Sequence, residues 1–292
     1  MLLKGKGFNP TIVTFNTIIN GFCLEGRLEE AIEILDQLTG IGCKPELVSY
    51  NTVMWAACKE EDGEKIRTIL HQMVIDGLKI SLFICTSLIQ YFCSRDEFSE
   101  GFKLLDAMKN IGMSPTIITY NVLMDALCKK GLCKTALRVF KDLKNLRLFP
   151  DRNSFNILLH AFVKEPQWPL VSKLLIGMHE QSLMPDAYTF SSLIYGLCKH
   201  QEVSSAIYLR DQMLQNGIKP TTSVYNTLLD ASLNRCKLWQ IYHILVDMAR
   251  DGCELDAVSF SILDCVLSEG GPYGYPRAIM MLKAFIKMVM EQ

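Results

Sequence analysis

The sequence of 292 residues has almost no excess charge of either sign, since 30 Lys and Arg residues face 31 Asp and Glu residues. A polycation that binds any polyanion through bulk charge is therefore excluded. Apolar runs stay well short of the roughly 18 residues that a membrane span needs, so no membrane partner is expected. The first residues have neither the apolar core of a secretory signal nor the Arg and Ser richness of a transit peptide.

The chain also lacks the clustered residues of a metal or catalytic site. None of its 11 cysteines forms a Cys-x-x-Cys pair, which argues against a zinc ribbon or disulfide scaffold and favours a reducing compartment. No Walker loop, G-x-S-x-G or H-E-x-x-H motif is present. His200-Gln201-Glu202 spells the H-x-E of zinc deaminases, but no Pro-Cys-x-x-Cys follows it. We therefore predict no catalytic residue, metal, cofactor or small-molecule substrate.

What the sequence does contain is a repeat of 35 residues. Related segments begin at an aromatic residue such as Phe15, Tyr50 or Tyr120, and we place each repeat start three residues earlier. The single array then has seven full repeats: 12–46, 47–81, 82–116, 117–151, 152–186, 187–221 and 222–256. Residues 1–11 match the tail of a preceding repeat, which suggests a fragment or a truncated product. Residues 257–292 form a degenerate eighth repeat that ends in a C-terminal cap helix.

Each repeat has the pattern of two helices. Repeat positions 4, 7, 8 and 11 are apolar, and so are positions 20, 23, 24 and 27, which is helical spacing. Breaks fall near position 15 at Gly26, Gly63 (two residues late), Gly131 and Pro166, and a recurring Gly at position 31 ends the second helix. Small residues at position 10, such as Gly196, are expected to let the paired helices approach closely. One pair cannot bury its apolar face alone, so neighbouring repeats must stack into an all-α solenoid.

The residue pattern of the repeat resembles that of the pentatricopeptide repeat family. The pattern is V-x-[ST]-[YF]-N-[TI]-L-[IL] and a small residue, then Cys-Lys near position 12, Glu-Ala near 19, Met at 27, Gly at 31 and Pro-Asp at 34. Residues 15–35 and 118–140 fit it closely. The even spacing resembles the P-type, restorer-of-fertility-like subtype, which has only standard-length repeats. The resemblance implies a right-handed α-solenoid superhelix of stacked helix-turn-helix repeats.

The resemblance also implies a function. Members bind single-stranded RNA sequence-specifically, with one base read per repeat. We therefore expect a non-enzymatic protein that acts in organelle transcript processing or stabilisation, in a mitochondrion or chloroplast. Its expected partners are single-stranded RNA and other processing factors. A protein-binding helical-repeat scaffold is the alternative.

The family's contact positions carry over residue by residue. Positions 5 and 35 contact the base edge, position 2 packs against the base faces, and a Lys near position 13 lies close to the phosphates. The base-reading pairs are Asn16/Glu46, Asn51/Ser81, Thr86/Thr116, Asn121/Asp151, Asn156/Asp186, Ser191/Thr221 and Asn226/Asp256. The base-stacking residues are Val13, Val48, Phe83, Ile118, Asn153, Tyr188, Ser223 and Val258, of which Asn153 and Ser223 depart from the apolar pattern. The phosphate-contacting residues are Lys59, Lys129, Lys164 and Lys199.

The residue types are compatible with these roles and with simpler ones. Position 5 always holds a short side chain with donor and acceptor capacity, on the polar edge of the first helix. Such a residue also serves as a local backbone partner, and Asp at position 35 also suits a helix N-terminus. The lysines could equally form an ordinary solvated face. Asn at position 5 with only Ser and Thr as substitutes favours base reading, because a peptide groove would not need that restriction.

The resemblance predicts an RNA sequence as well. In the family, Asn with Asp favours U, Asn with Ser favours C, and Thr or Ser at position 5 favours purines. Repeats four, five and seven then read U, repeat two reads C, and repeats three and six read a purine. The first repeat, with Glu46 at position 35, reads only as a pyrimidine. The predicted site, written 5′ to 3′, is Y-C-R-U-U-R-U.

Overall fold

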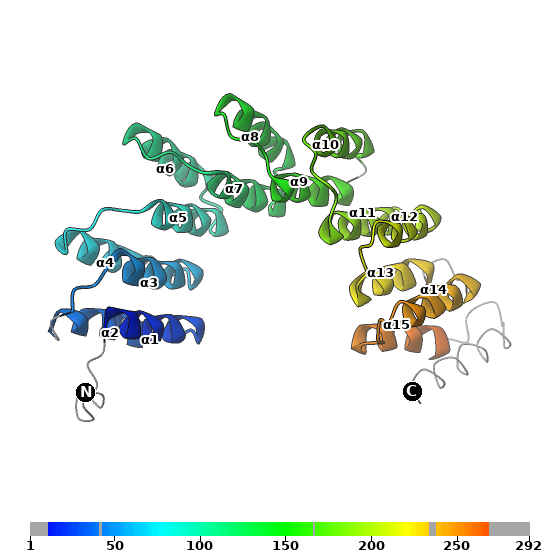
Figure 1. The fold of residues 1–292 in the computed structure, drawn as a ribbon, viewed down its shortest axis with the longest axis horizontal. Helices are drawn as coiled ribbons and strands as arrows, with labels where there is room; N and C mark the ends of the chain where they lie inside the picture. Colours follow the sequence, from blue (N-terminus) through cyan, green and yellow to red (C-terminus); the bar gives the residue numbers. More distant parts are fainter. Residues whose placement is uncertain (1–10, 41–42, 166, 234–237, 269–292) are drawn as a thin grey trace. The chain divides into compact units, whose positions relative to one another are not determined.

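The structure is a computed structural model that describes residues 11–40, 43–165, 167–233 and 238–268 (Figure 1). Throughout this part the regular secondary structure is helical. The first helices of the repeats are α1 (Ile12–Leu24), α3 (Leu47–Lys59), α5 (Leu82–Ser94), α7 (Ile117–Lys129), α9 (Arg152–Lys164), α11 (Ala187–Lys199), α13 (Thr222–Leu233) and α15 (Ala257–Ser268). The second helices are α2 (Leu28–Gly40), α4 (Gly63–Ile75), α6 (Phe98–Asn110), α8 (Cys133–Asn145), α10 (Trp168–Glu180), α12 (Val203–Gln215) and α14 (Leu238–Arg250).

The predicted all-α helical-repeat fold is confirmed. Each first helix begins at the residue where the 35-residue pattern starts a repeat, from Ile12 to Ala257. Five parts of the pattern lie outside the described residues: 1–10 of the preceding tail, 41–42 with the first position-31 glycine, the break at Pro166, 234–237 in the seventh repeat, and 269–292 with the expected cap helix. None of the described helices is both long and apolar enough to cross a membrane.

The helices form two compact units, Met1–Phe149 and Pro150–Gln292. In the first unit α1, α3, α5 and α7 pack each against the next, and every second helix packs on the first helix of its own repeat. The second unit repeats this arrangement with α9, α11, α13 and α15 as the stacked first helices. The buried core of each unit therefore lies between its first and second helices, with core residues such as Ile19 and Met73 in one unit and Leu228 and Ile244 in the other.

The turn between paired helices has the same backbone conformation whether or not a glycine stands at position 15. Repeat position 15 adopts positive φ at Gly26, Glu61, Asp96, Gly131 and Gln201. The sequence pattern placed the second break at Gly63, and this was wrong: Glu61 has φ 58°, and Gly63 is the first residue of α4. The reason is a hydrogen bond from the amide of Asp62 to the carbonyl of Ala57 (3.2 Å), which closes the helix end whatever side chain stands at position 15.

Gly196, at position 10 of the sixth repeat, lacks a side chain for a reason that differs from the expected one. A Cβ added at Gly196 would lie 2.5 Å from Cβ of Val163 and 3.1 Å from its carbonyl oxygen. Val163 belongs to α9 and Gly196 to α11, so the close approach is between first helices of neighbouring repeats and not between the two helices of one repeat. The small side chain thus sets the spacing of the stack, because the Val163 backbone cannot move aside cheaply.

Gly196→Ala is expected to destabilise the second unit by about 1–3 kcal/mol, because the added methyl group overlaps Val163. Gly21→Ala is the matched control at the same repeat position, where no described atom lies within 4 Å of the added Cβ. There the substitution is expected to stabilise α1 by up to about 1 kcal/mol through helix propensity. Chemical denaturation followed by circular dichroism measures both. Equal effects at the two glycines would show that helix spacing does not depend on Gly196.

Candidate nucleic-acid interface

The fifth and sixth repeats show how the residues of a predicted base-reading pair contact each other. Asp186 is the N-cap of α11, and its carboxylate oxygen Oδ1 accepts from the Thr189 amide at 2.9 Å. The side-chain nitrogen of Asn156, on the second turn of α9, donates to the same oxygen at 3.2 Å. Helix capping therefore fixes the carboxylate of Asp186, and this carboxylate in turn binds the Asn156 amide of its own repeat.

The seventh repeat has the same arrangement. Asn226 Nδ2 donates to Asp256 Oδ1 at 2.9 Å, and the Ser259 amide donates to that oxygen at 2.8 Å. In the second repeat the Ser81 hydroxyl donates to Asn51 Oδ1 at 2.8 Å. The structure thus brings together positions 5 and 35 in all three of these pairs, although they are 30 residues apart in the sequence.

The remaining position-5 residues differ in their contacts. Asn16 accepts from the Ser49 hydroxyl at 2.6 Å, while Glu46 caps α3. The hydroxyls of Thr86 and Ser191 donate to the carbonyls four residues earlier in their own helices, at 2.9 and 2.6 Å. Thr116 and Asp151 are the N-caps of α7 and α9. Asn121 lies in the first unit and Asp151 in the second.

Thr221 differs from the predicted pairing, because the structure does not join it to Ser191. Thr221 is exposed and directly precedes α13, where its backbone carbonyl accepts from the amides of Val224 and Tyr225 at 3.0 and 3.3 Å. Within the described part of the chain no hydrogen bond links the Thr221 hydroxyl to Ser191, since the Ser191 hydroxyl turns back to the carbonyl of Ala187. The sixth repeat therefore lacks the bonded pair of the Asn/Asp repeats, and base reading by Thr221 stays a prediction.

The asparagines at position 5 are more enclosed than the sequence indicated. A polar edge open to solvent was expected, yet Asn121, Asn156 and Asn226 are only 4–7% exposed. The enclosure of Asn156 and Asn226 follows from the position-35 carboxylate and the next repeat's position-3 side chain, which pack against the amide. Substituting these residues therefore carries a cost in stability as well as in binding.

Two carboxylates at position 35, those of Asp186 and Asp256, are held in the ionised form. Partial burial works to raise the pKa of Asp186, but hydrogen bonds from the amide and hydroxyl of Thr189 and from Asn156, with Arg152 nearby, outweigh it and lower the pKa. Hydrogen bonds from the Ser259 amide and the Asn226 side chain lower the pKa of Asp256. Both groups are therefore acceptors only at neutral pH. The stability that they add is present above the ordinary Asp pKa and is lost as the pH falls through the lowered value.

Position 2 presents apolar side chains to solvent. Val13, Val48, Phe83, Ile118, Tyr188 and Val258 are 49–68% exposed, and Asn153 and Ser223 are exposed too. These residues open the first helices, three positions before the position-5 side chains. The exposed apolar side chains at position 2 therefore mark a candidate binding surface.

The four lysines at position 13 are exposed but differ in their surroundings. Lys129 forms an ion pair with Asp125 at 2.6 Å, and Lys59 Nζ lies 5.3 Å from the centre of the Trp55 ring. Lys199 donates to the carbonyl of Lys164 at 3.0 Å. In at least two repeats, the side chain at position 9, one helical turn earlier, therefore interacts with the lysine ammonium group at position 13.

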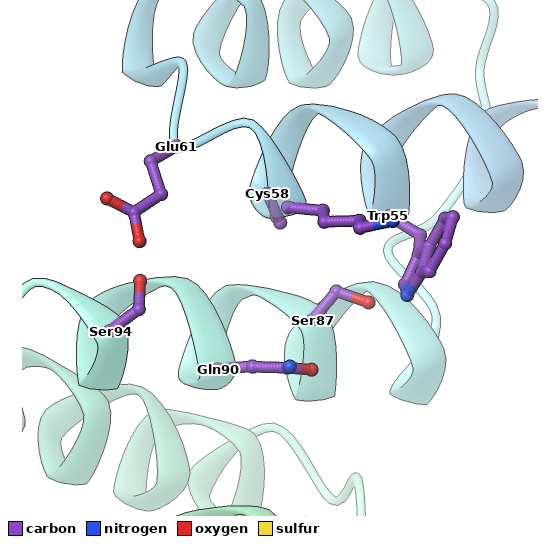
Figure 2. A pocket seen from close by; sticks show the side chains of 7 residues that line it. Trp55, Cys58, Glu61, Ser87, Gln90 and Ser94 are labelled. Carbon is purple, nitrogen blue, oxygen red and sulfur yellow. The ribbon is translucent and has the colours of Figure 1, made fainter. Parts of the chain in front are cut away.

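Hollows open beside two of these lysines, at equivalent places in the two units. Figure 2 shows the first, of about 330 Å³, where Trp55, Cys58 and Glu61 face Ser87, Gln90 and Ser94 across the gap between α3 and α5. The second, of about 570 Å³, lies between α11 and α13 and is lined by Tyr195, Cys198, Lys199, Gln201, Thr227, Asp230 and Ala231. Positions 9, 12, 13 and 15 of one repeat and 6 and 9 of the next form both hollows. Each unit therefore has a recess beside a position-13 lysine, Lys59 in the first and Lys199 in the second.

The cysteines at position 12 behave as small apolar residues. Burial raises the pKa of Cys58 and Cys198 to about 12, so both stay protonated thiols at neutral pH. Among the described residues, no three His, Cys, Asp or Glu side chains are grouped so that they could hold a metal ion.

Position 3 had no role assigned from the sequence, although its Ser or Thr is part of the repeat pattern. Ser49, Thr189 and Ser259 are fully buried and donate to the position-5 amides of the preceding repeats. Arg152, whose guanidinium lies 3.9 Å from Asp186 Oδ2, was missed as well. The recurring hydroxyl was visible in the pattern, but its partner lies 33 residues away.

Paired helices that recur every 35 residues, with polar pairs and exposed apolar residues at fixed positions, define an α-helical repeat protein. Models of the pentatricopeptide repeat match residues 6–39 and 48–78, and a model of the PPR repeat family matches 80–129, 115–164, 150–199 and 185–231. The chain belongs to the pentatricopeptide repeat family.

Solved structures share this fold. The chain is similar to the pentatricopeptide repeat protein PPR10 in complex with an 18-nt psaJ RNA element, with 22% identity and a TM-score of 0.62 over 89% of this chain and 42% of that one. It is similar also to PPR10 from maize, with 22% identity and a TM-score of 0.60 over 89% of this chain and 41% of that one. The chain thus spans less than half the length of these relatives. A comparison with curated protein sequences found no match.

Proposed function

We propose that the protein binds single-stranded RNA sequence-specifically, reading one base per repeat, and does not itself cleave it. The observation that carries this proposal is the pairing of positions 5 and 35, as in Asn156 and Asp186. The RNA in the PPR10 complex supports the choice of partner. By the same family likeness, we place the protein's work in organelle transcript processing or stabilisation, in a mitochondrion or chloroplast and alongside other processing factors.

The geometry of the pair favours uracil. One amide proton of Asn156 is donated to Asp186 Oδ1, which leaves the second proton to donate to a base. Asp186 Oδ2 is a lone-pair acceptor beside it. A donor next to an acceptor complements the O4 and N3–H groups of uracil, whereas cytosine N3 has no proton to give.

The Thr and Ser side chains at position 5 offer a base hydrogen-bonding groups that differ from those of the Asn/Asp pairs. The Ser191 hydroxyl donates to its own helix and so offers lone pairs to the groove. The Thr86 hydroxyl also donates to its own helix, but it lies 2.9 Å from the Thr119 hydroxyl as well. Such a lone-pair acceptor can accept from adenine N6–H or guanine N1–H, and also from cytosine N4–H or uracil N3–H. The purines proposed for repeats three and six, whose position-35 residues are Thr116 and Thr221, therefore rest on the family resemblance.

Position 2 and the lysines complete the proposed interface. Exposed side chains such as Phe83 and Tyr188 are suited to stack on bases, each worth about 1–3 kcal/mol. Lys59, Lys129, Lys164 and Lys199 lie beside the path that the phosphates would take. Each unit thus has two exposed lysines at position 13, in a chain whose net charge is only −1.

Asp125→Asn is expected to tighten binding of every single-stranded RNA by about threefold, because it removes a negative charge 2.6 Å from Lys129. The slope of log affinity against log salt should steepen by up to about 0.7, the value of one phosphate contact on a single strand. Asp106→Asn is the matched control, since it removes a comparable ion pair with Lys109 (3.3 Å) from the second helix α6. Titrations at two salt concentrations measure both variants. An equal gain for Asp106→Asn would point to net charge and not to Lys129.

Binding of a single strand that carries U-C-A-U-U-A-U tests the proposed function. It should bind at least about tenfold more tightly than a strand of the same composition in scrambled order, since each well-read base is worth about 1–3 kcal/mol. The same sequence in a duplex should bind weakly, because its base edges are already paired. Equal binding of all three would refute base reading, and no binding at low salt would favour the protein-binding scaffold.

A further inference from the structure

The side chain at repeat position 3 is a buried hydroxyl in most repeats. Ser49, Thr119, Ser154, Thr189 and Ser259 are all fully buried. Three of these hydroxyls contact the position-5 amide of the preceding repeat, 33 residues earlier in the sequence. In each case both residues belong to the same compact unit. The Thr189 hydroxyl lies 2.7 Å from Asn156 Oδ1, the Ser259 hydroxyl 2.6 Å from Asn226 Oδ1, and the Ser49 hydroxyl 2.6 Å from Asn16 Oδ1.

The hydroxyl acts on one end of the amide and the carboxylate on the other. Thr189 Oγ1 also lies 2.9 Å from Asp186 Oδ1, but that oxygen already accepts from the Thr189 and Asn156 nitrogens. A hydroxyl has a single proton, and its shorter contact is with Asn156 Oδ1. The amide oxygen of Asn156 therefore faces Thr189, and its nitrogen faces Asp186.

The two repeats without a hydroxyl at this position differ in an informative way. Ile84 follows the Asn51/Ser81 pair, and there Ser81 itself donates to Asn51 Oδ1 at 2.8 Å. Val224 follows the Ser191/Thr221 pair, and the Ser191 hydroxyl bonds to its own helix. Ser191 thus has no position-3 hydroxyl beside it, whereas the position-3 hydroxyl of Thr119 lies 2.9 Å from the hydroxyl of Thr86. A hydroxyl does satisfy the amide oxygen of four Asn readers, namely Asn16, Asn51, Asn156 and Asn226.

We propose that the position-3 hydroxyl is a positioning residue that fixes which end of the Asn amide faces the base. The proposal rests on the proposed base reading. The reading unit of an Asn/Asp repeat is then three residues shared by two consecutive repeats: Asn156, Asp186 and Thr189 for one base, and Asn226, Asp256 and Ser259 for another. A repeat's choice between U and C thus depends on a residue of its neighbour that does not touch the RNA.

The physical reason is that Asn156 Oδ1 is nearly buried and needs a donor. Without the hydroxyl, the oxygen must turn towards water in the groove, and the amide nitrogen leaves the position from which it donates to uracil O4. Cytosine and uracil then become more alike to this repeat. Other repeats keep their own hydroxyls, so their preferences remain.

The test is the ratio of affinities for U and C at one nucleotide of a U-C-A-U-U-A-U single strand. Thr189→Val should lower that ratio about fivefold at the fifth nucleotide, which corresponds to about 1 kcal/mol, and leave it unchanged at the seventh. Ser259→Ala should lower the ratio at the seventh nucleotide and leave it unchanged at the fifth. Thr189→Ser keeps the hydroxyl and should restore the wild-type ratio. Val224→Ala truncates a buried position-3 side chain without a hydroxyl, and should lower stability without changing base preference at the sixth nucleotide.

Circular dichroism confirms that each variant is folded before its ratio is measured, and Ser259→Ala carries the test if Thr189→Val fails to fold. A uniform loss of affinity with unchanged ratios would overturn the proposal and assign position 3 a purely structural role. If the wild type itself shows no preference for U at the fifth and seventh nucleotides, the base reading fails, and this proposal fails with it.

Discussion

Replacing Asn156 by Thr together with Asp186 by Asn is expected to change the base preferred by the fifth repeat from U to A. The substitution removes the amide donor and the lone-pair acceptor that complement uracil. A hydroxyl reader takes their place, and hydroxyl readers at position 5 are the ones assigned to purines. Contacts to one base edge are worth about 1–3 kcal/mol, so the relative affinity for U and A should swing by about 10- to 100-fold.

Competition binding with strands that differ only at the fifth nucleotide measures this swing. The Asn226/Asp256 pair is the internal control, because it has the same hydrogen bonds and should keep its preference for U at the seventh nucleotide. Asn at position 186 retains the capping ability of Asp, so α11 should stay folded. An unchanged preference at the fifth nucleotide, with tight binding preserved, would refute the one-repeat, one-base assignment.

Replacing Asp247 by Ala is expected to lower the free energy of unfolding of the second unit by about 3–5 kcal/mol. Arg210 is only 3% exposed, and its Nη2 lies 2.8 Å from Asp247 Oδ2. Its Nη1 also donates to the Tyr225 hydroxyl at 3.4 Å. Without Asp247 the buried Arg210 guanidinium would lose its main counter-charge. Water could solvate the guanidinium in its place only if the core opened.

Two further variants separate charge burial from general damage. Asp211→Ala removes a half-exposed carboxylate 2.8 Å from Arg210 Nε that lacks hydrogen-bond geometry, and should cost less than about 1 kcal/mol. Arg210→Met combined with Asp247→Ala should recover most of the lost stability, because no unpaired charge remains in the core. Chemical denaturation of the three variants gives the comparison. A double variant no more stable than Asp247→Ala would show that the loss came from packing.

The placement of the helices could be predicted because it depends on local sequence. The period sets each first-helix start, and the glycines at position 31, such as Gly77 and Gly112, have the positive φ that ends a helix. The exposed apolar residues at position 2 also follow from spacing alone, since they fall outside the apolar stripe. These features need no knowledge of what packs against what.

Features that depend on the next repeat could not be predicted in the same way. The hydroxyl of Thr189 acts on Asn156, 33 residues earlier, and Gly196 is small because of Val163 in the neighbouring first helix. Arg210 stands at position 24, where the pattern expects an apolar residue, and only the folded unit shows that Asp247 and Tyr225 meet it. The enclosure of Asn156 has the same origin, since its cover comes from the following repeat.

The most direct test of base reading is selection of RNA by the wild-type protein from a randomised pool that contains single strands and duplexes. We expect a single-stranded consensus close to Y-C-R-U-U-R-U, with U strongest at the fifth and seventh positions, where the reading pairs are Asn156/Asp186 and Asn226/Asp256. Enrichment of duplex RNA, or of a consensus without U at those two positions, would contradict it.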